Sequence, residues 1–321
     1  MATGANGNNP RGRSANKERY KTLAQAETQA SLVLAGRTFA WGQRTHIMGI
    51  VNATPDSFSG DGLGYDAAAA VARGLRFVAD GADILDVGGE STRPGAEPVP
   101  ADEEMRRILP VIAGLRARTD VPISVDTFKA EVASAAVRAG AVMINDVWGL
   151  RRDPRIADVA ASSGAALVIV HNRPASATID GLGGMVPHDG YTDLLGEIRG
   201  ELLESAAVAE RAGVPRGRII LDPGLGFAKT PAHNMELLRG WTALRVGYPL
   251  LIGPSRKSFI GRVLGLGPAE RDEGTAAVVS LLAAQGAEII RVHDVRTMVR
   301  VVRVVDAIVG PGRWAGVDGH P

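Results

Sequence analysis

The runs HIMGIVN (residues 46–52) and ILDVGGE (residues 84–90) flank an Ala-rich amphipathic stretch at residues 66–80, and this alternation repeats to the end of the chain. Six more short apolar runs follow: PISVD (122–126), AVMIND (141–146), ALVIVH (166–171), RIILD (218–222), PLLIG (249–253) and EIIRVH (288–293). Helices are expected near 66–80, 102–117, 129–139, 153–164, 193–213, 233–246, 274–286 and 295–309, with Asp66, Asp102 and Thr275 as plausible caps. Continuous β-branched runs separated by helices are typical of buried parallel strands.

Polar residues at the ends of these runs distinguish two parallel architectures. Nearly every run ends in one: Asn52, Asp86, Glu90, Asp126, Asn145, Asp146, His171, Asp222, Arg291 and His293. In a barrel all strand ends face one mouth, whereas a doubly wound sheet gathers functional residues mainly at one switch point. Eight units in about 265 residues also match a barrel in count and length. The sequence therefore predicts an α/β protein built as a single (β/α)8 TIM barrel.

The segments outside the barrel, which is expected to span residues 46–312, differ from it in composition. Residues 1–17 are rich in Gly and Asn with almost no apolar content. This predicts a disordered N-terminal tail and not a signal peptide. Residues 18–45 form an N-terminal segment in which residues 31–43 resemble a short β-hairpin. Residues 313–321 are expected to be a C-terminal tail.

Charge and composition exclude several functional classes. Among 321 residues, 36 Lys and Arg balance 35 Asp and Glu, so a net charge of +1 gives no support for nucleic-acid or anionic-membrane partners. No apolar run approaches the roughly 18 residues of a membrane span. The chain has no Cys, which excludes disulfides, thiolate nucleophiles and Cys-ligated metals and fits a reducing cytoplasm. The 40 Gly residues favour tight loops close to a ligand.

Asp126, Asn145 and Asp222 bring carboxylates and an amide to a largely apolar barrel mouth. Such groups can bind a metal, perform acid–base catalysis or recognise a ligand rich in N–H donors. A metal cage would usually need His or several carboxylates in close register, so the mixed donors and acceptors favour a heteroaromatic ligand. Asp146 is more simply explained as a cap of the following helix.

The segment GPSRKSF (253–259) opens a helix after the seventh run. Its backbone N–H groups and the cations of Arg256 and Lys257 predict an anion site. Arg291 and His293 are two residues apart on the eighth run, so their side chains share a face. Because the loops after strands seven and eight are the usual phosphate position in these barrels, we interpret the group as a phosphate site.

Two Gly-rich loops complete the expected mouth. Residues 52–64 form a long connection that favours a mobile lid over a simple surface turn. Residues 88–95 carry Arg93, whose planar fork suits phosphate or carboxylate, although a solvated Arg in a turn explains it equally well.

Taken together, seven motifs in this order resemble dihydropteroate synthase: NATPDSF (52–58), DVGGESTRPG (86–95), SVDTFK (124–129), IND (144–146), DPGLGFAK (222–229), SRKSF (255–259) and RVHDV (291–295). The resemblance covers roughly residues 40–310 and touches every strand end but the fifth. It implies a transferase of folate synthesis that joins 6-hydroxymethyl-7,8-dihydropterin pyrophosphate to p-aminobenzoate, releasing pyrophosphate, and that is the target of sulfonamides. It also implies a cytoplasmic homodimer that uses Mg²⁺.

The resemblance assigns roles to residues of each motif. Asp126, Asn145, Asp222, Lys257 and Arg291 would bind the pterin, and all of these except Asn145 are the expected catalytic residues. The p-aminobenzoate pocket would consist of Phe58, Thr92, Arg93, Pro94, Phe227 and Ser258. Pyrophosphate would contact Asn52, Arg93, Arg291 and His293, with Asn52 also near the metal.

Two departures from the family pattern leave roles open. The acid of the first loop is displaced by one residue, to Asp61, and the frequent His-Met after strand five is replaced by His171 and Asn172. The alternatives are a pterin-dependent methyltransferase acting on a corrinoid protein, a catalytically silent paralogue that binds pterin or a partner, and a sugar-phosphate barrel enzyme. The complete loop at 91–95 and the anion site favour the synthase, which has a pyrophosphate to expel.

Overall fold

The computed structural model describes residues 31–54, 66–91, 97–173, 177–179, 185–187 and 190–310. The expected tails at 1–17 and 313–321 lie outside these ranges, as does most of the expected lid. In the described part, no helix combines the length and the apolar character needed to cross a membrane.

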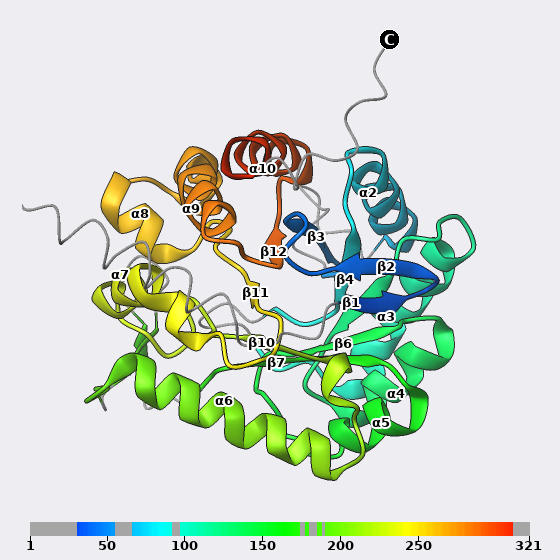
Figure 1. Cartoon of the computed structure of the whole chain (residues 1–321). Coiled ribbons are helices and arrows are strands. Elements are labelled where there is room, and N and C mark those ends of the chain that lie inside the picture. Colours follow the sequence, from blue (N-terminus) through cyan, green and yellow to red (C-terminus); the bar gives the residue numbers. More distant parts are fainter. Residues whose placement is uncertain are drawn as a thin grey trace, which may run out of the picture.

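Eight parallel strands form the centre of the molecule, and helices surround them (Figure 1). The strands are β3 (His46–Asn52), β4 (Ile84–Gly88), β5 (Ile123–Asp126), β6 (Met143–Asp146), β7 (Ala166–Val170), β10 (Ile219–Asp222), β11 (Leu251–Ile252) and β12 (Ile289–Val292). Their spatial order is β10-β7-β6-β5-β4-β3-β12-β11. A parallel bridge between Leu221 and Leu250 joins the two outer strands, so the sheet closes into the predicted (β/α)8 barrel.

Helices follow the barrel strands along the chain, one after each strand and two after β11. They are α2 (Ala67–Ala79), α3 (Ala101–Arg116), α4 (Ala130–Ala139), α5 (Ile156–Ser163), α6 (Leu194–Arg211), α7 (Pro231–Gly240), α8 (Ser258–Leu264), α9 (Asp272–Ala284) and α10 (Val295–Val309). Short 3-10 turns occur at η3 (Arg216–Arg218), η4 (Trp241–Leu244) and η5 (Pro268–Glu270).

Only one of the three expected helix caps is correct. The Asp66 carboxylate accepts from the N–H groups of Ala68 and Ala69 at the start of α2. Asp102 and Thr275 instead lie inside α3 and α9, because these helices begin earlier than expected.

The alternation of side chains along each strand determines which residues face the helices and which face the barrel interior. Because side chains alternate along a strand, Ile47 and Leu85 pack outward against the helices, whereas Met48 and Ile84 point into the barrel. The barrel interior is apolar near the strand starts and becomes polar toward the strand ends.

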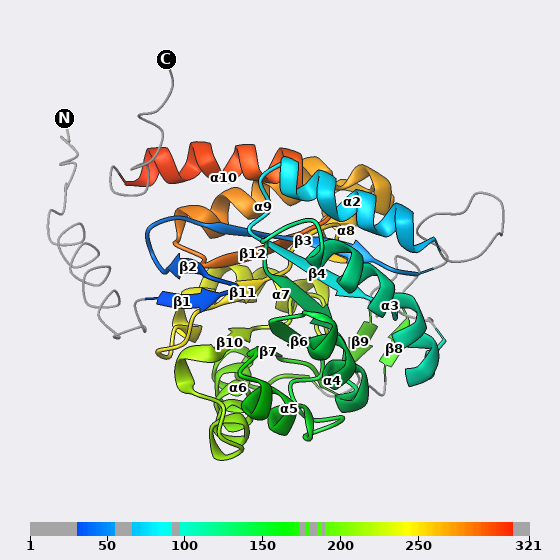
Figure 2. The same ribbon diagram turned by 90° about the vertical axis from the view of Figure 1, so that its right-hand side faces the viewer.

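The expected N-terminal hairpin is confirmed and closes the apolar end of the barrel. It consists of β1 (Ser31–Leu34) and β2 (Arg37–Ala40), joined by a turn in which Ala35 and Gly36 both have positive φ. Side chains of this hairpin belong to the same buried cluster as the interior-facing Met48. A second hairpin, β8 (Ala177–Ile179) with β9 (Met185–Pro187), lies toward the opposite end (Figure 2). The first hairpin therefore leaves the polar end as the one free to form a site.

Candidate active site

The polar end of the barrel brings together side chains from five strands, β4, β5, β6, β10 and β12, and from the loop that follows β11. We name Asp86, Asp126, Asn145, Asp222, Lys257 and Arg291 the mouth cluster. The sequence predicted all of these as site residues except Asp86, to which it gave no role.

Arg291 is at the centre of the mouth cluster. Its Nε donates to Asp86 Oδ2 at 2.6 Å, and its Nη2 donates to Asp126 Oδ2 at 2.5 Å. Asn145 Nδ2 donates to the same Asp86 oxygen at 3.1 Å. Asp86 is fully buried and links an arginine on β12 to an asparagine on β6. An acid in an apolar strand run is itself a signal that a partner must exist, because an isolated buried carboxylate is very costly.

Several polar atoms of this region are still available. Within the described part of the chain, Asp86 Oδ1, Asn145 Oδ1 and Ser124 Oγ are buried and have no hydrogen-bond partner. Buried polar atoms are nearly always paired in proteins, so such a group of free acceptors indicates a place where a ligand supplies donors.

Burial changes the protonation of the mouth cluster. It raises the pKa of Asp126 to about 7, against the opposing charge of Arg291. It also raises the pKa of Asp222 to about 6, although the Gly224 N–H donates to this carboxylate at 2.7 Å. Burial lowers the pKa of Lys257 to about 8, with Asp222 acting in the opposite sense. The carboxylates and the ammonium can therefore all change charge close to neutral pH.

Lys257, at the start of α8, faces the loop that follows β10. Its Nζ lies 4.1 Å from the centre of the Phe227 ring, within range of a cation–π contact. Gly226 has a φ of +82°, and a Cβ at this position would lie 2.9 Å from Lys257 Cδ. The glycine thus lets the loop backbone approach the lysine side chain. Phe227 and Lys257 were predicted as site residues from two separate motifs, and the structure places them in contact.

The predicted anion site is only partly assembled as expected. Ser258 is the first residue of α8, and His293 follows β12. Ser255 Oγ lies 2.9 Å from the His293 Nδ1 atom, which orients the imidazole. Arg256 makes two contacts of 2.8 and 2.7 Å with Asp272 of α9, so its guanidinium already has a carboxylate partner, and its predicted place in the anion site stays a prediction. The partner acid lies on a helix whose start the sequence did not locate.

Asn52, the expected metal ligand, ends β3 and pairs in register with Gly88 of β4. No group of three or more His, Asp or Glu side chains suited to a metal ion occurs among the residues that the structure describes. One amide oxygen is too little for a protein-built cage, but it fits a Mg²⁺ that retains water and phosphate oxygens as most of its ligands.

Other predicted residues are either outside the site or outside the described ranges. Asp146 accepts from the N–H groups of Trp148 and Leu150, at 2.9 and 2.6 Å, so it stabilises the turn after β6. Asn172 is buried directly beyond β7. The positions that lie outside the described ranges are Phe58, Asp61, Thr92, Arg93 and Pro94.

Comparison with known proteins identifies the family. The model of the family described as "Pterin binding enzyme" matches residues 48–293, most of the chain. The dihydropteroate synthase of Bacillus subtilis is 47% identical over 272 residues, which are 84% of this chain and 90% of that protein. The chain belongs to the dihydropteroate synthase family of pterin-binding enzymes.

Relatives from other organisms agree with this membership of the dihydropteroate synthase family. The Escherichia coli K12 dihydropteroate synthase is 41% identical over 263 residues, covering 82% of this chain and 91% of that protein. The solved structure of the Xanthomonas albilineans enzyme with 4-aminobenzoic acid superposes with a TM-score of 0.79 at 45% identity, covering 88% of this chain and 98% of that one. The resemblance seen in the sequence motifs is therefore confirmed.

Proposed function

We propose that the barrel mouth is where this member of the family joins 6-hydroxymethyl-7,8-dihydropterin pyrophosphate to p-aminobenzoate, giving 7,8-dihydropteroate and pyrophosphate. The observation that carries the proposal is the convergence of Asp126, Asn145 and Asp222 with Lys257 and Arg291 at one end of the barrel. This arrangement supplies acceptors for a flat nitrogen heterocycle together with cations for the group that leaves it.

The pterin ring is matched by the acceptors of the mouth cluster. The amino group and ring N–H of a pterin are donors, and Asp126, Asp222 and the free Asn145 Oδ1 provide acceptors for them. Lys257 supplies a donor for the ring acceptors. Arg291 is held in plane by Asp86 and Asp126, which leaves its flat face to stack on the heterocycle.

The p-aminobenzoate ring would lie beside Phe227, Lys257 and Ser258. Phe227 offers an aromatic face, and Ser258 at the start of α8 offers a hydroxyl and a backbone N–H. The loop residues Phe58, Thr92, Arg93 and Pro94 would complete this pocket.

The leaving pyrophosphate would be bound by Asn52, Arg93, Arg291 and His293. A Mg²⁺ ion, when bound, would neutralise negative charge on the pyrophosphate, with Asn52 as its protein ligand. The His293 imidazole is oriented by Ser255 and can donate to a phosphate oxygen.

The chemistry needs no nucleophilic side chain. The arylamine nitrogen of p-aminobenzoate is neutral at pH 7 and forms the new bond to the pterin methylene carbon. The C–O bond to pyrophosphate breaks, pyrophosphate takes the electron pair, and the amine then loses a proton. An electron-rich dihydropterin can share positive charge at its methylene, which favours a dissociative displacement. A negligible secondary deuterium isotope effect at this carbon would argue against that path.

Pyrophosphate release tests the proposal. Purified protein is incubated with the pterin pyrophosphate, with and without p-aminobenzoate, and pyrophosphate is measured by a coupled assay. We expect release that depends on p-aminobenzoate. Release that is independent of it, or no release, would contradict the proposed reaction.

We also propose that the enzyme works as a homodimer in the cytoplasm. The absence of Cys supports a reducing compartment. The packed helices α8 and α9 expose Val263, Leu264 and Leu281, which supports a contact between two copies there. Sedimentation of the wild type and of Leu281→Glu tests this contact, because only the wild type should sediment as a dimer.

A further inference from the structure

Lys229, at the end of the segment DPGLGFAK (222–229), is a buried lysine to which the proposed chemistry gives no role. Only 3% of its surface is exposed. Its Nζ donates to the carbonyl oxygens of Gly224 and Phe227, at 3.0 and 3.1 Å, and lies 3.0 Å from His171 Nδ1. All three ammonium protons therefore have acceptors, and two of these acceptors belong to the loop that carries Phe227.

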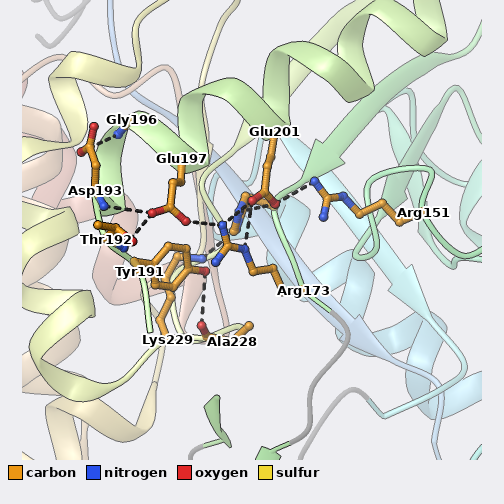
Figure 3. Close-up of polar contacts among 11 residues, drawn as sticks. Arg151, Arg173, Tyr191, Thr192, Asp193, Gly196, Glu197, Glu201, Ala228 and Lys229 are labelled. Carbon is orange, nitrogen blue, oxygen red and sulfur yellow. Dashed lines mark hydrogen bonds and ion pairs between the residues drawn. The ribbon is translucent and has the colours of Figure 1, made fainter. Parts of the chain in front are cut away.

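Charged groups of α6 and of the segments after β6 and β7 lie near Lys229; Figure 3 shows Glu201 between Arg151 and Arg173. His171 Nε2 lies 3.2 Å from Glu201 Oε2 on α6, and Arg151 contacts the same oxygen at 2.7 Å. Arg173 donates to the other Glu201 oxygen at 2.9 Å through Nε. We name Arg151, His171, Arg173, Glu201 and Lys229 the loop cluster. It joins the end of β7 and helix α6 to the loop after β10.

The backbone of that loop is unusual enough to need such support. Gly224, Gly226 and Ala228 all have positive φ, of +69°, +82° and +48°. At Gly224 an added Cβ would lie 1.8 Å from the carbonyl oxygen of His171, so the loop packs directly against the end of β7. For Ala228 a positive φ is costly, because L-residues with a Cβ avoid this region.

The orientation of the carbonyl groups in the loop after β10 indicates that the Lys229 ammonium stabilises the backbone conformation of this loop. Gly224 and Phe227 both direct their oxygens inward, to the single ammonium of Lys229. Burial lowers the pKa of Lys229 to about 7, and the charge of the nearby Asp222 carboxylate acts in the opposite sense. The two carbonyl oxygens satisfy the ammonium protons that this burial removes from water. On the other face of the same loop, the Phe227 ring meets Lys257.

We propose that Lys229 is a positioning residue: its ammonium gathers the carbonyls of the 223–230 loop so that Phe227 is presented to Lys257, and it thereby determines affinity for the p-aminobenzoate ring. The inference rests on the proposed function for the assignment of Phe227 to that substrate. Of the groups assigned to the pterin, Asp126 and Asn145 lie on neighbouring strands and are not among the hydrogen-bond partners of Lys229. Asp222 accepts from Gly224 of the same loop, and the charge of Lys229 opposes the rise in its pKa that burial causes, so the effect on the pterin should be smaller than that on p-aminobenzoate but not zero.

The test compares Lys229→Met with Arg245→Met. Arg245 is a matched control, because it contacts a buried carboxylate, Glu288, at 2.7 Å near the start of β12, away from the mouth. For each variant, KM for both substrates and Tm are measured. Lys229→Met should raise KM for p-aminobenzoate about tenfold or more, as expected for lost hydrogen bonds to a charged group, and leave KM for the pterin pyrophosphate within about threefold. Arg245→Met should lower Tm and leave both KM values unchanged.

A second variant, Glu201→Gln, tests the same inference if Lys229→Met does not fold. Glu201→Gln keeps Lys229 but removes the charge behind His171, so it should raise KM for p-aminobenzoate in the same direction by a smaller factor. The inference is overturned if folded Lys229→Met or Glu201→Gln leaves KM for p-aminobenzoate unchanged, or raises both KM values equally. A failure of the proposed function would be visible separately, as wild-type protein that releases no pyrophosphate in the same assay.

Discussion

The mouth cluster and the loop cluster are both groups of charges at the same end of the barrel, but they differ in how their atoms are paired. In the loop cluster, Lys229 has three acceptors and Glu201 has three cationic or imidazole neighbours. His171 Nε2 and Glu201 Oε2 make no hydrogen bond among the described residues, but they lie 3.2 Å apart, and Arg151 lies 2.7 Å from the same Glu201 oxygen. In the mouth cluster, Asp86 and Asn145 each keep a buried oxygen that finds no partner in the described part of the protein.

This difference separates groups that act on a ligand from groups that support the fold. Leaving a buried polar atom unpaired costs about 1–3 kcal/mol, so a cluster with free acceptors is stable only where a ligand or water completes it. A cluster whose charges satisfy one another has no such need and instead fixes the backbone around it. Changes in the mouth cluster should therefore reduce catalysis, and changes in the loop cluster should mainly alter stability and loop geometry.

The largest effect is expected from Lys257→Ala and Asp222→Asn in the mouth cluster. Each removes a group that the proposed function places against the substrate, so kcat/KM should fall by about 10²–10³-fold, as when one stabilising donor is lost from an active site. Circular dichroism and Tm should remain close to wild type. Near-normal turnover in either variant would show that the site is assigned to the wrong residues.

The free energy of unfolding at acid pH should distinguish the loop cluster from the mouth cluster. Burial lowers the pKa of His171 to about 4 from an ordinary 6.5, and the charge of Lys229 acts in the same sense. The neutral imidazole is therefore favoured in the folded state, and its contribution is complete above pH 6.5 and is lost as the pH falls toward 4. A shift of this size corresponds to about 3 kcal/mol.

His171→Asn is the control for this acid effect, because its amide oxygen can still accept from Lys229 but does not titrate. Unfolding by urea at pH 7 and pH 4 should show a smaller loss of free energy in the variant than in the wild type. Asp126 and Asp222 of the mouth cluster have raised pKa values, so their protonation adds to the free energy of unfolding as the pH falls. This contribution is the same in the variant and the wild type. Identical losses would mean that His171 is not held neutral by the loop cluster.

The pH dependence of catalysis should report the mouth cluster instead. Asp222 and Asp126, with pKa values of about 6 and 7, must be ionised to accept N–H groups, so kcat/KM should rise with pH through this range. Lys257, with a pKa of about 8, must be protonated to donate, so the rate should fall above pH 8. In Lys257→Arg the falling limb should move to higher pH, and a limb that stays at pH 8 would assign it to another group.

The smallest effect is expected for Tyr191→Phe at the edge of the loop cluster. The Tyr191 hydroxyl donates to the Ala228 carbonyl at 3.3 Å, a long hydrogen bond worth about 0.5–1 kcal/mol. KM for p-aminobenzoate should therefore change by no more than about fivefold, below the tenfold or larger change expected for Lys229→Met. A loss as large as that in Lys229→Met would mean that the loop depends on its contacts in general and not on the lysine.

Much of the fold could be predicted from the sequence because the signals are local. Apolar runs with β-branched residues, spaced by amphipathic segments, indicate strands and helices within a few residues of where they occur. The hairpin at Ser31–Ala40 could be predicted for the same reason, because the residues that form its turn are adjacent in the sequence. Helix starts were less certain, as Asp102 and Thr275 show, because a cap is defined by backbone angles that no single residue type fixes.

The sequence by itself determined the barrel, the family and nearly all members of the mouth cluster, because strand ends in a closed parallel barrel must share one mouth. Only the tertiary structure decided which charges pair there. Asp86 and Arg291 are 205 positions apart and meet because β12 lies next to β3, and β3 next to β4. Arg256 pairs with Asp272, and the Lys229 ammonium donates to a carbonyl oxygen of its own loop. Periodicity along a chain indicates which face a side chain is on, but its partner depends on distances that only closure of the barrel sets.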